Sequence, residues 1–545
     1  MLAQLLSDIT TWWKPNPDGR VHLTMESLTA KREEEDKAQL SAYLIKNAPL
    51  APYHHQIEGV YKLLTTPYLL LADEMGLGKT KQVIDAAQTM YMNGTIDRVI
   101  IACPSAVRSV WFDPILGEWA KHVWPDFPLQ VAEFRNKVRI WKTTEDEERL
   151  KVVVTNYEFL RNEDNLAKMG KVVGPKTLLV VDESSYVKNH AAQQTKAIRI
   201  LRKDCGRVVL LNGTPLTEGV GDLFSQAYIM NQNILSCRNK HHFDAIYAVK
   251  GGWQGRQILS WRNVDHLQEK MAPYVVRRLK EQCLDLPPKI PSVNIQVTLD
   301  PKTWKLYKDM ENEFIAWLGT NEASVSTHAA VRAIRLQQIT SGYLGGIAGQ
   351  KIDANGELVE VESNVAVIQN VGNEKRLAVI EWFKDRLAED PQFKCVIWAR
   401  FTKEILDLIE AFRVALPNVE VGRIAGGQTE KERNHAIQLL DPRTAPKGPV
   451  AVVGNPASGG MGLTLVAAST VLYISNYWRL ITRLQSEDRV HRPGQTRPVN
   501  YFDVIAVGPK GQRTIDFSIV KRLAAKNEVA QMTSAAWLSE LGGNE

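Results

Sequence analysis

Residues 68–92 read YLLLADEMGLGKTKQVIDAAQTMYM, in which an apolar run, a glycine-containing turn and a helical pattern follow one another directly. The run does not alternate with polar residues, which is typical of a parallel strand buried on both faces. Beyond the turn, apolar residues recur at helical spacing. A strand, a glycine-rich turn and a helix in this order are the setting of a phosphate-binding loop. The stretch therefore predicts an α/β domain with a phosphate site.

The same rhythm of apolar run, turn and helical pattern recurs in two regions. Further buried-strand patterns in the first region are RVIIACP, KVVVTNY, TLLVVDE and RVVLLNG, and those in the second are KCVIWAR, PVAVVGN, TVLYISN and VNYFDVIAV. Strands that alternate with helices imply right-handed crossovers and doubly wound sheets. We therefore expect an α/β fold with two RecA-like, parallel-sheet lobes and helical protrusions between them.

Five segments are predicted from these patterns. They are an N-terminal accessory segment (1–45), a first lobe (46–232), helical protrusions and a linker (233–367), a second lobe (368–530) and a C-terminal tail (531–545). In the middle segment, residues 304–318 have an apolar helical face, and Asn355-Gly356 lies between strand-like flanks, a hairpin signal. The first segment contains a charged helix pattern and either docks a partner or caps the first lobe.

Composition limits the class of protein only loosely. The 545 residues carry a formal net charge of +6, which permits a polyanionic partner without identifying one. Five scattered cysteines fit a reducing cytosol. His54-His55 and His241-His242 have no cysteines at ligand spacing, so we expect no metal site there. No run is long enough to span a bilayer and no signal peptide is evident, so we expect a cytoplasmic protein without membrane contact.

The sequence DEMGLGKT, residues 73–80, supplies the chemistry of a phosphate loop. Gly76 and Gly78 allow backbone N–H groups to close on phosphates at a helix N-terminus. Lys79 can neutralise β- and γ-phosphate charge, and the Thr80 hydroxyl can hold Mg²⁺. The strict pattern has glycine where Asp73 stands.

Two further elements complete a predicted ATP site. Asp182 and Glu183 end a buried strand, at the sheet edge where ligands bind; Asp182 would hold Mg²⁺ and Glu183 would orient the attacking water. Arg489 and Arg492, three apart in QSEDRVHRPGQ, would face the same way in a helical turn and stabilise the γ-phosphate from the second lobe. In isolation, acids ending a strand are often solvated turn residues and arginines beside Pro-Gly are often surface residues. Their conjunction predicts hydrolysis of Mg²⁺-bound ATP.

The order of these motifs resembles the Swi/Snf-type ATPases of helicase superfamily II, from about Tyr53 to Lys526. YHHQIEGV places Gln56 at the family's adenine-recognising glutamine, and DEMGLGKT is that family's form of the phosphate loop. GNPASGGMGLTL and the following YISNYW are similar to its nucleic-acid-contacting and coupling motifs, which include Gly462 and Trp478. In VDESSYVKN, Ser185 stands where the family usually has a histidine that couples nucleotide to DNA. Arg277 and Arg278 fit its basic segment after the first lobe.

The resemblance implies a compact bacterial or viral motor that uses ATP and Mg²⁺ to move on double-stranded DNA. Binding through backbone phosphates would depend on salt and show little sequence preference. Predicted phosphate contacts, each with the alternative role of an N-cap or turn residue, are Ser105, Thr155, Asn156, Thr214, Thr402, Ser458 and Thr464. The motif resemblance adds Trp478 as a further predicted nucleic-acid contact. Residues 341–346, SGYLGG, weakly resemble compact members that act on branched DNA.

Two other functions remain open at this stage. A strand-separating or fork-remodelling helicase would need a wedge, for which the Asn355-Gly356 hairpin is a candidate. An ATP-gated binding adaptor would not move at all. The intact Lys79, Asp182 and Glu183 argue against loss of hydrolysis, but fold alone does not decide among these functions.

Overall fold

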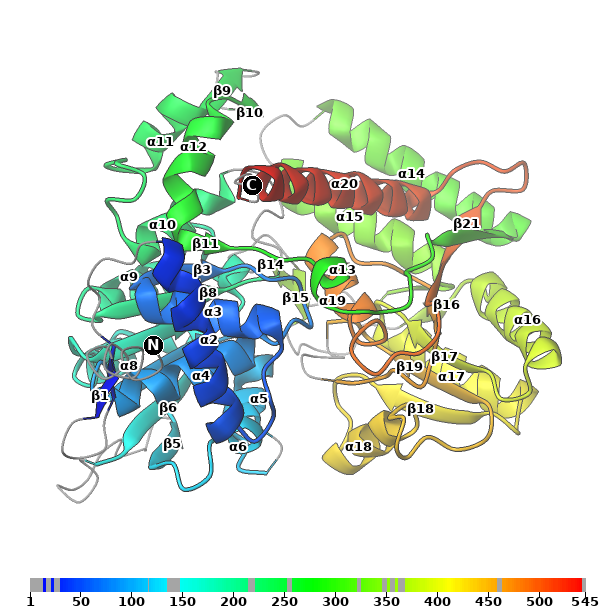
Figure 1. Cartoon of the computed structure of the whole chain (residues 1–545). Coiled ribbons are helices and arrows are strands. Elements are labelled where there is room, and N and C mark those ends of the chain that lie inside the picture. Colours follow the sequence, from blue (N-terminus) through cyan, green and yellow to red (C-terminus); the bar gives the residue numbers. More distant parts are fainter. Residues whose placement is uncertain are drawn as a thin grey trace. The chain divides into compact units, whose positions relative to one another are not determined.

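The computed structural model describes residues 13–15, 21–23, 30–115, 117–134, 148–213, 221–251, 257–320, 325–345, 350–352, 358–360, 368–457 and 463–541. Internal contacts divide the chain into two compact units (Figure 1). The first comprises Met1–Leu284 with Ala530–Glu545, and the second comprises Asp285–Val529.

The described part of the first unit is built on a seven-stranded sheet of order β11-β3-β8-β7-β4-β6-β5. Every neighbouring pair is parallel. Because parallel neighbours cannot be joined by a hairpin, each connection crosses a face of the sheet. The strands are β3 (Tyr68–Leu71), β4 (Arg98–Cys103), β5 (Leu129–Glu133), β6 (Leu150–Asn156), β7 (Thr177–Val181), β8 (Arg207–Leu211) and β11 (Val275–Val276).

Both faces of this sheet are covered, as strand β3 shows. Leu70 packs in a cluster with Ile198 of helix α9 and Leu223 of helix α10. Leu69 and Leu71 point to the opposite face and are equally buried. The longer helices of the unit are α3 (His54–Thr65), α4 (Lys79–Met92), α8 (Glu163–Gly170), α9 (Gln193–Arg202), α10 (Asp222–Met230), α11 (Lys240–Tyr247) and α12 (Val264–Met271).

The N-terminal helix α2 (Ala30–Asn47) packs onto the first unit. Leu40 and Leu44 are buried, and Tyr43 meets Trp124 edge to face with ring centroids 5.5 Å apart. These contacts support capping of the first lobe as one role of the N-terminal segment. Shorter described elements of the unit are β1 (Trp13–Pro15), β2 (Val21–Leu23), α5 (Arg108–Phe112), α6 (Glu118–His122), α7 (Tyr157–Leu160), β9 (Ala248–Gly251), β10 (Gln257–Trp261) and α13 (Lys280–Cys283).

The second unit has its own parallel sheet, six-stranded within the described residues, of order β12-β21-β20-β17-β19-β18. Alternate residues of β17 face two different clusters. Cys395 and Ile397 pack with helices α16 and α17, whereas Val396 and Trp398 pack with helix α18. The strands are β12 (Val293–Thr298), β17 (Lys394–Trp398), β18 (Glu420–Ile424), β19 (Val450–Gly454), β20 (Thr470–Tyr473) and β21 (Asn500–Val507). The predicted fold class, two doubly wound parallel-sheet lobes, is confirmed.

Helices of the second unit begin and pack for identifiable reasons. Thr429 and Glu432 form the predicted capping box at the start of α18, with the Glu432 N–H 3.3 Å from the Thr429 hydroxyl. Tyr307 of α14 is buried against Leu336 and Ile339 of α15. The helices are α14 (Pro301–Thr320), α15 (Val325–Thr340), α16 (Glu374–Glu389), α17 (Thr402–Ala415), α18 (Glu430–Gln438), α19 (Leu480–Glu487) and the first part of α20 (Ile515–Leu541), whose residues from Ala530 onward are assigned to the first unit.

The predicted middle segment is shared between the units. Helices α11 and α12 belong to the first unit and α14 and α15 to the second, because the boundary between the two units lies between Leu284 and Asp285. The predicted hairpin is flanked by β14 (Gln350–Ile352) and β15 (Leu358–Glu360), which pair antiparallel, while Asn355 and Gly356 themselves lie outside the described residues. The predicted segment boundaries remain predictions.

Candidate active site

The turn between β3 and α4 has the backbone of a phosphate loop. Gly76 and Gly78 have φ of 85° and 73°, in the left-handed region that favours glycine. A Cβ on Gly78 would also lie 2.2 Å from Nε2 of Gln56. Helix α4 begins directly after, at Lys79, so its unsatisfied N–H groups lie beside the loop.

The ammonium group of Lys79 is held over the loop by its own backbone. Nζ donates to the carbonyl oxygens of Asp73 at 2.6 Å and Glu74 at 3.2 Å. These acceptors place a positive charge beside the first turn of α4, where phosphate oxygens would also meet backbone N–H groups. The predicted role of Lys79 is therefore compatible with its geometry.

Helix α3 is fastened to the same loop through Leu77. Gln56 Nε2 donates to the Leu77 carbonyl at 3.3 Å, and His55 Nε2 donates to it at 3.0 Å. The side-chain oxygen Oε1 of Gln56 accepts from the Tyr53 N–H at 3.1 Å. Burial lowers the pKa of His55, so this imidazole is neutral near pH 7. Gln56, predicted to recognise adenine, thus stands against the phosphate loop.

Asp182 follows β7 at the carboxyl edge of the sheet, as predicted. Its backbone N–H donates to Ala102 of the neighbouring strand β4 at 2.9 Å. The carboxylate accepts from the indole N–H of Trp111 at 2.8 Å and from the Glu183 N–H at 2.8 Å. Burial raises the pKa of Asp182, and these two hydrogen bonds and the charge of Lys79 act against that rise.

Glu183 adopts an unusual backbone conformation. Its φ of 49° and ψ of 57° lie in the left-handed region, which costs a residue with a side chain roughly 1–3 kcal/mol. Such strain concentrates at functional sites, because the surrounding structure must hold it in place. The conformation therefore agrees with the predicted role of Glu183 in orienting water.

The carboxylate of Asp182 and the hydroxyl of Thr80 are oxygen donors of the kind Mg²⁺ prefers. Two protein oxygens completed by water and phosphate are a common Mg²⁺ ligand set, so the residues fit the ion. Among the residues the structure describes, no cluster of three or more His, Cys, Asp or Glu side chains forms an all-protein metal site.

Arg489 and Arg492 belong to the second unit and lie in turns, not in a helix. Helix α19 ends at Glu487, before both arginines, and Pro493 with Gly494, at φ 100°, follows them. The expected helical turn is thus corrected. The turns are fixed to residues 463–468: Leu465 N–H donates to the Arg489 carbonyl at 2.9 Å, and Arg492 donates to the Leu463 carbonyl at 2.7 Å.

Gln495 fixes these turns further, because its side-chain amide donates to the carbonyls of Val466 at 3.2 Å, Ala468 at 2.8 Å and Val490 at 3.2 Å. Three acceptors on one buried amide fix the loop that carries both arginines. The sequence motif contained Gln495, but its anchoring role was not predicted.

The residues predicted to contact nucleic acid differ in their exposure. Ser105 is exposed, and its hydroxyl donates to Glu158 at 3.0 Å, as does the largely buried amide of Asn156 at 2.9 Å. Thr155 is completely buried, so its side chain cannot reach a nucleic acid and this prediction is wrong. Thr402 is exposed at the start of α17.

The other predicted contacts include Thr464 and Trp478, which are half-buried. Thr214, Ser458 and Gly462 lie outside the described residues.

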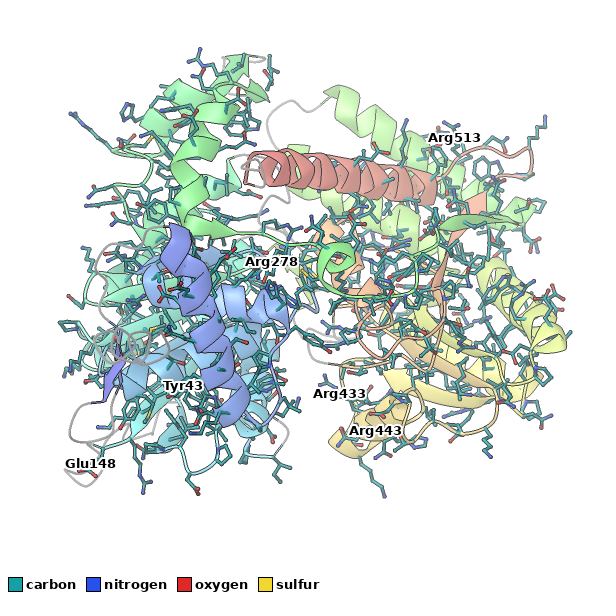
Figure 2. All side chains as sticks on the ribbon, viewed as in Figure 1. Tyr43, Glu148, Arg278, Arg433, Arg443 and Arg513 are labelled. Atoms are coloured by element: carbon teal, nitrogen blue, oxygen red, sulfur yellow. The ribbon has the colours of Figure 1, made fainter. Side chains whose placement is uncertain are left out.

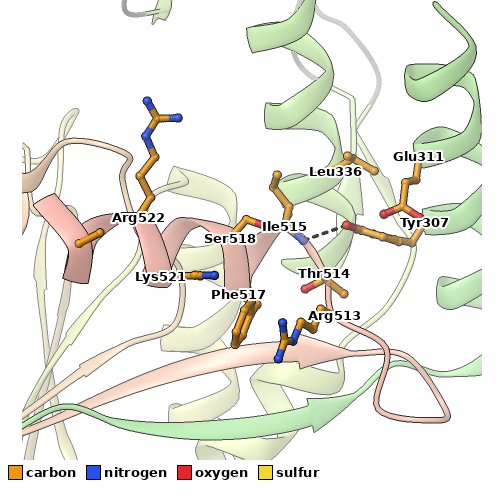
Figure 3. A pocket seen from close by; sticks show the side chains of 11 residues that line it. Tyr307, Glu311, Leu336, Arg513, Thr514, Ile515, Phe517, Ser518, Lys521 and Arg522 are labelled. Carbon is orange, nitrogen blue, oxygen red and sulfur yellow. Dashed lines mark hydrogen bonds between the residues drawn. The ribbon is translucent and has the colours of Figure 1, made fainter. Parts of the chain in front are cut away.

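A separate pocket in the second unit contains none of the predicted site residues (Figure 3). It lies between α14 and the start of α20, where the Ile515 N–H donates to the Tyr307 hydroxyl at 2.9 Å. Its lining includes Arg513, Lys521 and Arg522. The pocket lacks a phosphate loop and paired carboxylates, so we do not assign the reaction to it.

Two known protein families match this chain. The SNF2-related domain matches residues 55–341, more than half of the chain, and the helicase conserved C-terminal domain matches residues 375–494. The chain belongs to the SNF2-related family. The resemblance to Swi/Snf-type members of helicase superfamily II is thereby confirmed, with Ser185 as the departure already noted.

The SNF2-related chain is similar to longer proteins. An uncharacterized ATP-dependent helicase of Mycoplasma genitalium is 24% identical over 467 residues, covering 85% of this chain and 40% of that protein. SWI/SNF-related matrix-associated actin-dependent regulator of chromatin subfamily A-like protein 1 of Xenopus laevis is 26% identical over 490 residues, covering 88% and 44%. The chain therefore spans less than half the length of either relative.

Among solved structures, the Sulfolobus solfataricus SWI2/SNF2 ATPase core in complex with dsDNA is 22% identical, with a TM-score of 0.40 and coverage of 91% of this chain and 96% of that one.

In the described residues, no helix is both long enough and apolar enough to cross a membrane.

Proposed function

We propose that this SNF2-related chain is a DNA-dependent ATPase that translocates on double-stranded DNA. One observation carries the proposal: Lys79 is held over a glycine-shaped loop by the Asp73 and Glu74 carbonyls, and its charge acts on Asp182 at the end of β7. Binding a nucleoside triphosphate with its metal requires a cation for the phosphates and a carboxylate for the metal at the same sheet edge.

The residues of the first unit divide the chemistry among them. Lys79 and the N–H groups at the start of α4 bind and orient the phosphates. Thr80 and Asp182 would hold Mg²⁺, which when bound offsets negative charge on the β- and γ-phosphate oxygens. Glu183 orients the attacking water and accepts its proton.

The second unit supplies two arginines. Arg489 and Arg492 are carried on turns anchored to residues 463–468, and we assign them to the charge that develops on the γ-phosphate during transfer. Nucleotide binding and release would shift the two units between states with different grip on DNA, and this shift would advance the protein.

The track is assigned to duplex DNA from family membership and from the motif resemblance. Ser105, Thr402, Thr464 and Trp478 are the described candidates for contact with it. Because such contacts are made to phosphates, binding should weaken steeply with salt and vary little with sequence. Branched DNA is the narrower candidate substrate.

The test is steady-state ATP hydrolysis with no nucleic acid, plain duplex, single strands, forked duplex and RNA in parallel. Plain duplex should stimulate hydrolysis most. Movement is tested separately by displacement of a third strand from a triplex, which requires travel along the duplex without separating its strands.

Lys79→Ala should abolish hydrolysis while the thermal unfolding temperature is kept. Lys121→Ala, which removes a surface partner of Glu118, is the matched control. Hydrolysis by folded Lys79→Ala at the wild-type rate would refute the site. Preference for forks would favour branched-DNA remodelling. Preference for single strands or RNA would favour strand separation, and no stimulation by any of them would refute a nucleic-acid motor.

A further inference from the structure

The residue that departs from the strict phosphate-loop pattern has an unexpected environment. Asp73 is 0% exposed, and a carboxylate removed from water is stable only when paired and hydrogen-bonded. Arg278 donates from Nε to Oδ1 and from Nη2 to Oδ2, both at 3.0 Å. Gln82 of α4 donates to Oδ2 at 3.1 Å. This two-pronged, charge-assisted pairing is the strongest geometry available to an arginine and a carboxylate.

Arg278 comes from a segment 205 residues further along the chain (Figure 2). Strand β11 brings it there by pairing in parallel with β3. Beyond the strands the pairing continues along the loop: the Ala72 N–H donates to Val276 at 2.7 Å, and the Glu74 N–H donates to the Arg278 carbonyl at 2.9 Å. The first half of the phosphate loop therefore has a backbone partner of its own.

Arg277 holds the other side of the loop. Its Nη1 donates to the carbonyls of Ala72 at 2.5 Å and Gly213 at 2.6 Å. Of the two adjacent arginines, Arg277 thus bonds to the backbone of Ala72 and Arg278 to the side chain of Asp73. The Ala72 carbonyl and the Asp73 carboxylate are therefore both hydrogen-bonded to arginine.

Arg278 also reaches helix α3. Its Nη1 donates to the His55 carbonyl and to Glu58 Oε2, the latter at 3.2 Å. Gln56 lies between these two residues in the chain and contacts the loop at Leu77. One guanidinium therefore connects the glutamine-bearing helix with the loop that carries Lys79.

We propose that Arg278 is a positioning residue for the nucleotide phosphates. By fixing the Asp73 side chain, it fixes the Asp73 carbonyl, which accepts from Lys79 Nζ at 2.6 Å, and so sets the ammonium group before nucleotide binds. Asp73 replaces the usual glycine because the loop needs an acidic partner for this arginine. The inference rests on the proposed function, since it assumes that the loop binds ATP phosphates.

The experiment is an equilibrium titration of the full chain with a fluorescent ADP analogue, without DNA, alongside thermal unfolding. Arg278→Lys keeps the positive charge but cannot make the two-pronged guanidinium pairing with Asp73, so the dissociation constant of the analogue should rise by about tenfold. Arg202→Lys is the matched control, because Arg202 donates to the carbonyls of Ile229 and Met230 at the end of α10, in the same unit. The control should bind the analogue like the wild type.

A double-mutant cycle separates positioning from general destabilisation. Asp73→Asn and Arg278→Gln should each weaken binding of the analogue. The double variant should bind no more weakly than the single variant with the lower affinity, because the two changes remove the same interaction. Gln82→Met, which removes a lesser donor to Asp73, should weaken binding in the same direction by a smaller factor and is informative if Arg278→Gln does not fold.

The outcomes are distinguishable. A folded Arg278→Lys protein that binds the analogue within about twofold of the wild type, or strictly additive effects in the cycle, overturns the positioning role. A lower unfolding temperature in Arg278→Lys with unchanged affinity overturns it too, because a purely structural residue would behave so. Failure of the folded wild type itself to bind the analogue would instead refute the proposed function.

Discussion

The indole N–H of Trp111 donates to Oδ2 of Asp182 at 2.8 Å, and Trp111 is completely buried. A hydrogen bond to the charged form of an acid lowers its pKa, and here the bond opposes the rise caused by burial. The tryptophan thus helps to keep the proposed metal ligand ionised although burial favours its neutral form.

Trp111→Phe should therefore raise the pKa of Asp182 further. Because the ligand must be ionised, hydrolysis falls as the pH drops through that pKa. In the variant this fall should begin at a higher pH, and hydrolysis should require more Mg²⁺. The measurement is ATP hydrolysis against pH at several Mg²⁺ concentrations. Trp119→Phe is the control, because the buried Trp119 N–H has no hydrogen-bond partner among the described residues; identical shifts in both variants would contradict the assignment.

Gly78→Ala should weaken nucleotide binding by at least about tenfold. A Cβ there meets Gln56 Nε2 at 2.2 Å and must be accommodated at φ 73°. Gly94, at the other end of α4, has nearly the same φ of 74° but open space around it. Gly94→Ala should share only the backbone strain, about 1 kcal/mol of unfolding free energy, and leave nucleotide affinity unchanged. Equal effects on affinity would show that strain alone is responsible.

Arg492→Ala should lower the turnover of ATP by two orders of magnitude or more while nucleotide affinity changes little, since a transition-state contact is absent in the ground state. Single-turnover hydrolysis and analogue binding separate the two quantities. The control is Arg497→Ala, which removes an exposed arginine bonded to the Ala467 carbonyl at 2.9 Å. If turnover and affinity fell together, Arg492 would be a binding residue.

Glu404, buried in α17, should make the second unit less stable as the pH rises. Burial raises its pKa to about 7, from 4.5, against the opposing charge of Lys375 and the Ser475 hydrogen bond. The folded state therefore binds the proton more tightly than the unfolded state. The resulting stability is fully present below pH 4.5 and is lost as the pH rises to about 7.

Glu404→Gln removes this dependence and should raise the free energy of unfolding at pH 8 by about 1–3 kcal/mol, with little change at pH 5. Denaturant unfolding at the two pH values provides the measurement. Glu410→Gln, an exposed position on the same helix, should change neither value. A gain of the same size at pH 5 would exclude titration of Glu404 as the cause.

The strands that the sequence predicts and those it misses differ in one physical respect. The nine predicted runs are all the interior strands of the two sheets, and the four missed strands, β5, β11, β12 and β18, are the sheet edges. Interior strands are covered on both faces, which demands a continuous apolar run. Edge strands have less to bury: β5 is half-buried throughout, and β12 is mostly exposed. Their sequences therefore carry no such signal.

The site divides in a similar way. Lys79, Asp182 and Glu183 could be predicted because each lies in a local strand-and-turn context that defines its surroundings. Trp111 and Arg278 could not, because they act on partners 71 and 205 residues away. Only the tertiary fold brings them there. Thr155 illustrates the opposite error: the sequence suggests a phosphate contact for this hydroxyl-bearing residue, and the sheet buries it.

The left-handed backbone of Glu183 places stability and activity in opposition at a single codon. Replacement by glycine would relieve the strain and remove the carboxylate, so the expected protein is more stable and inactive. Variants selected only for thermal resistance would accumulate this change, whereas selection for turnover would reject it.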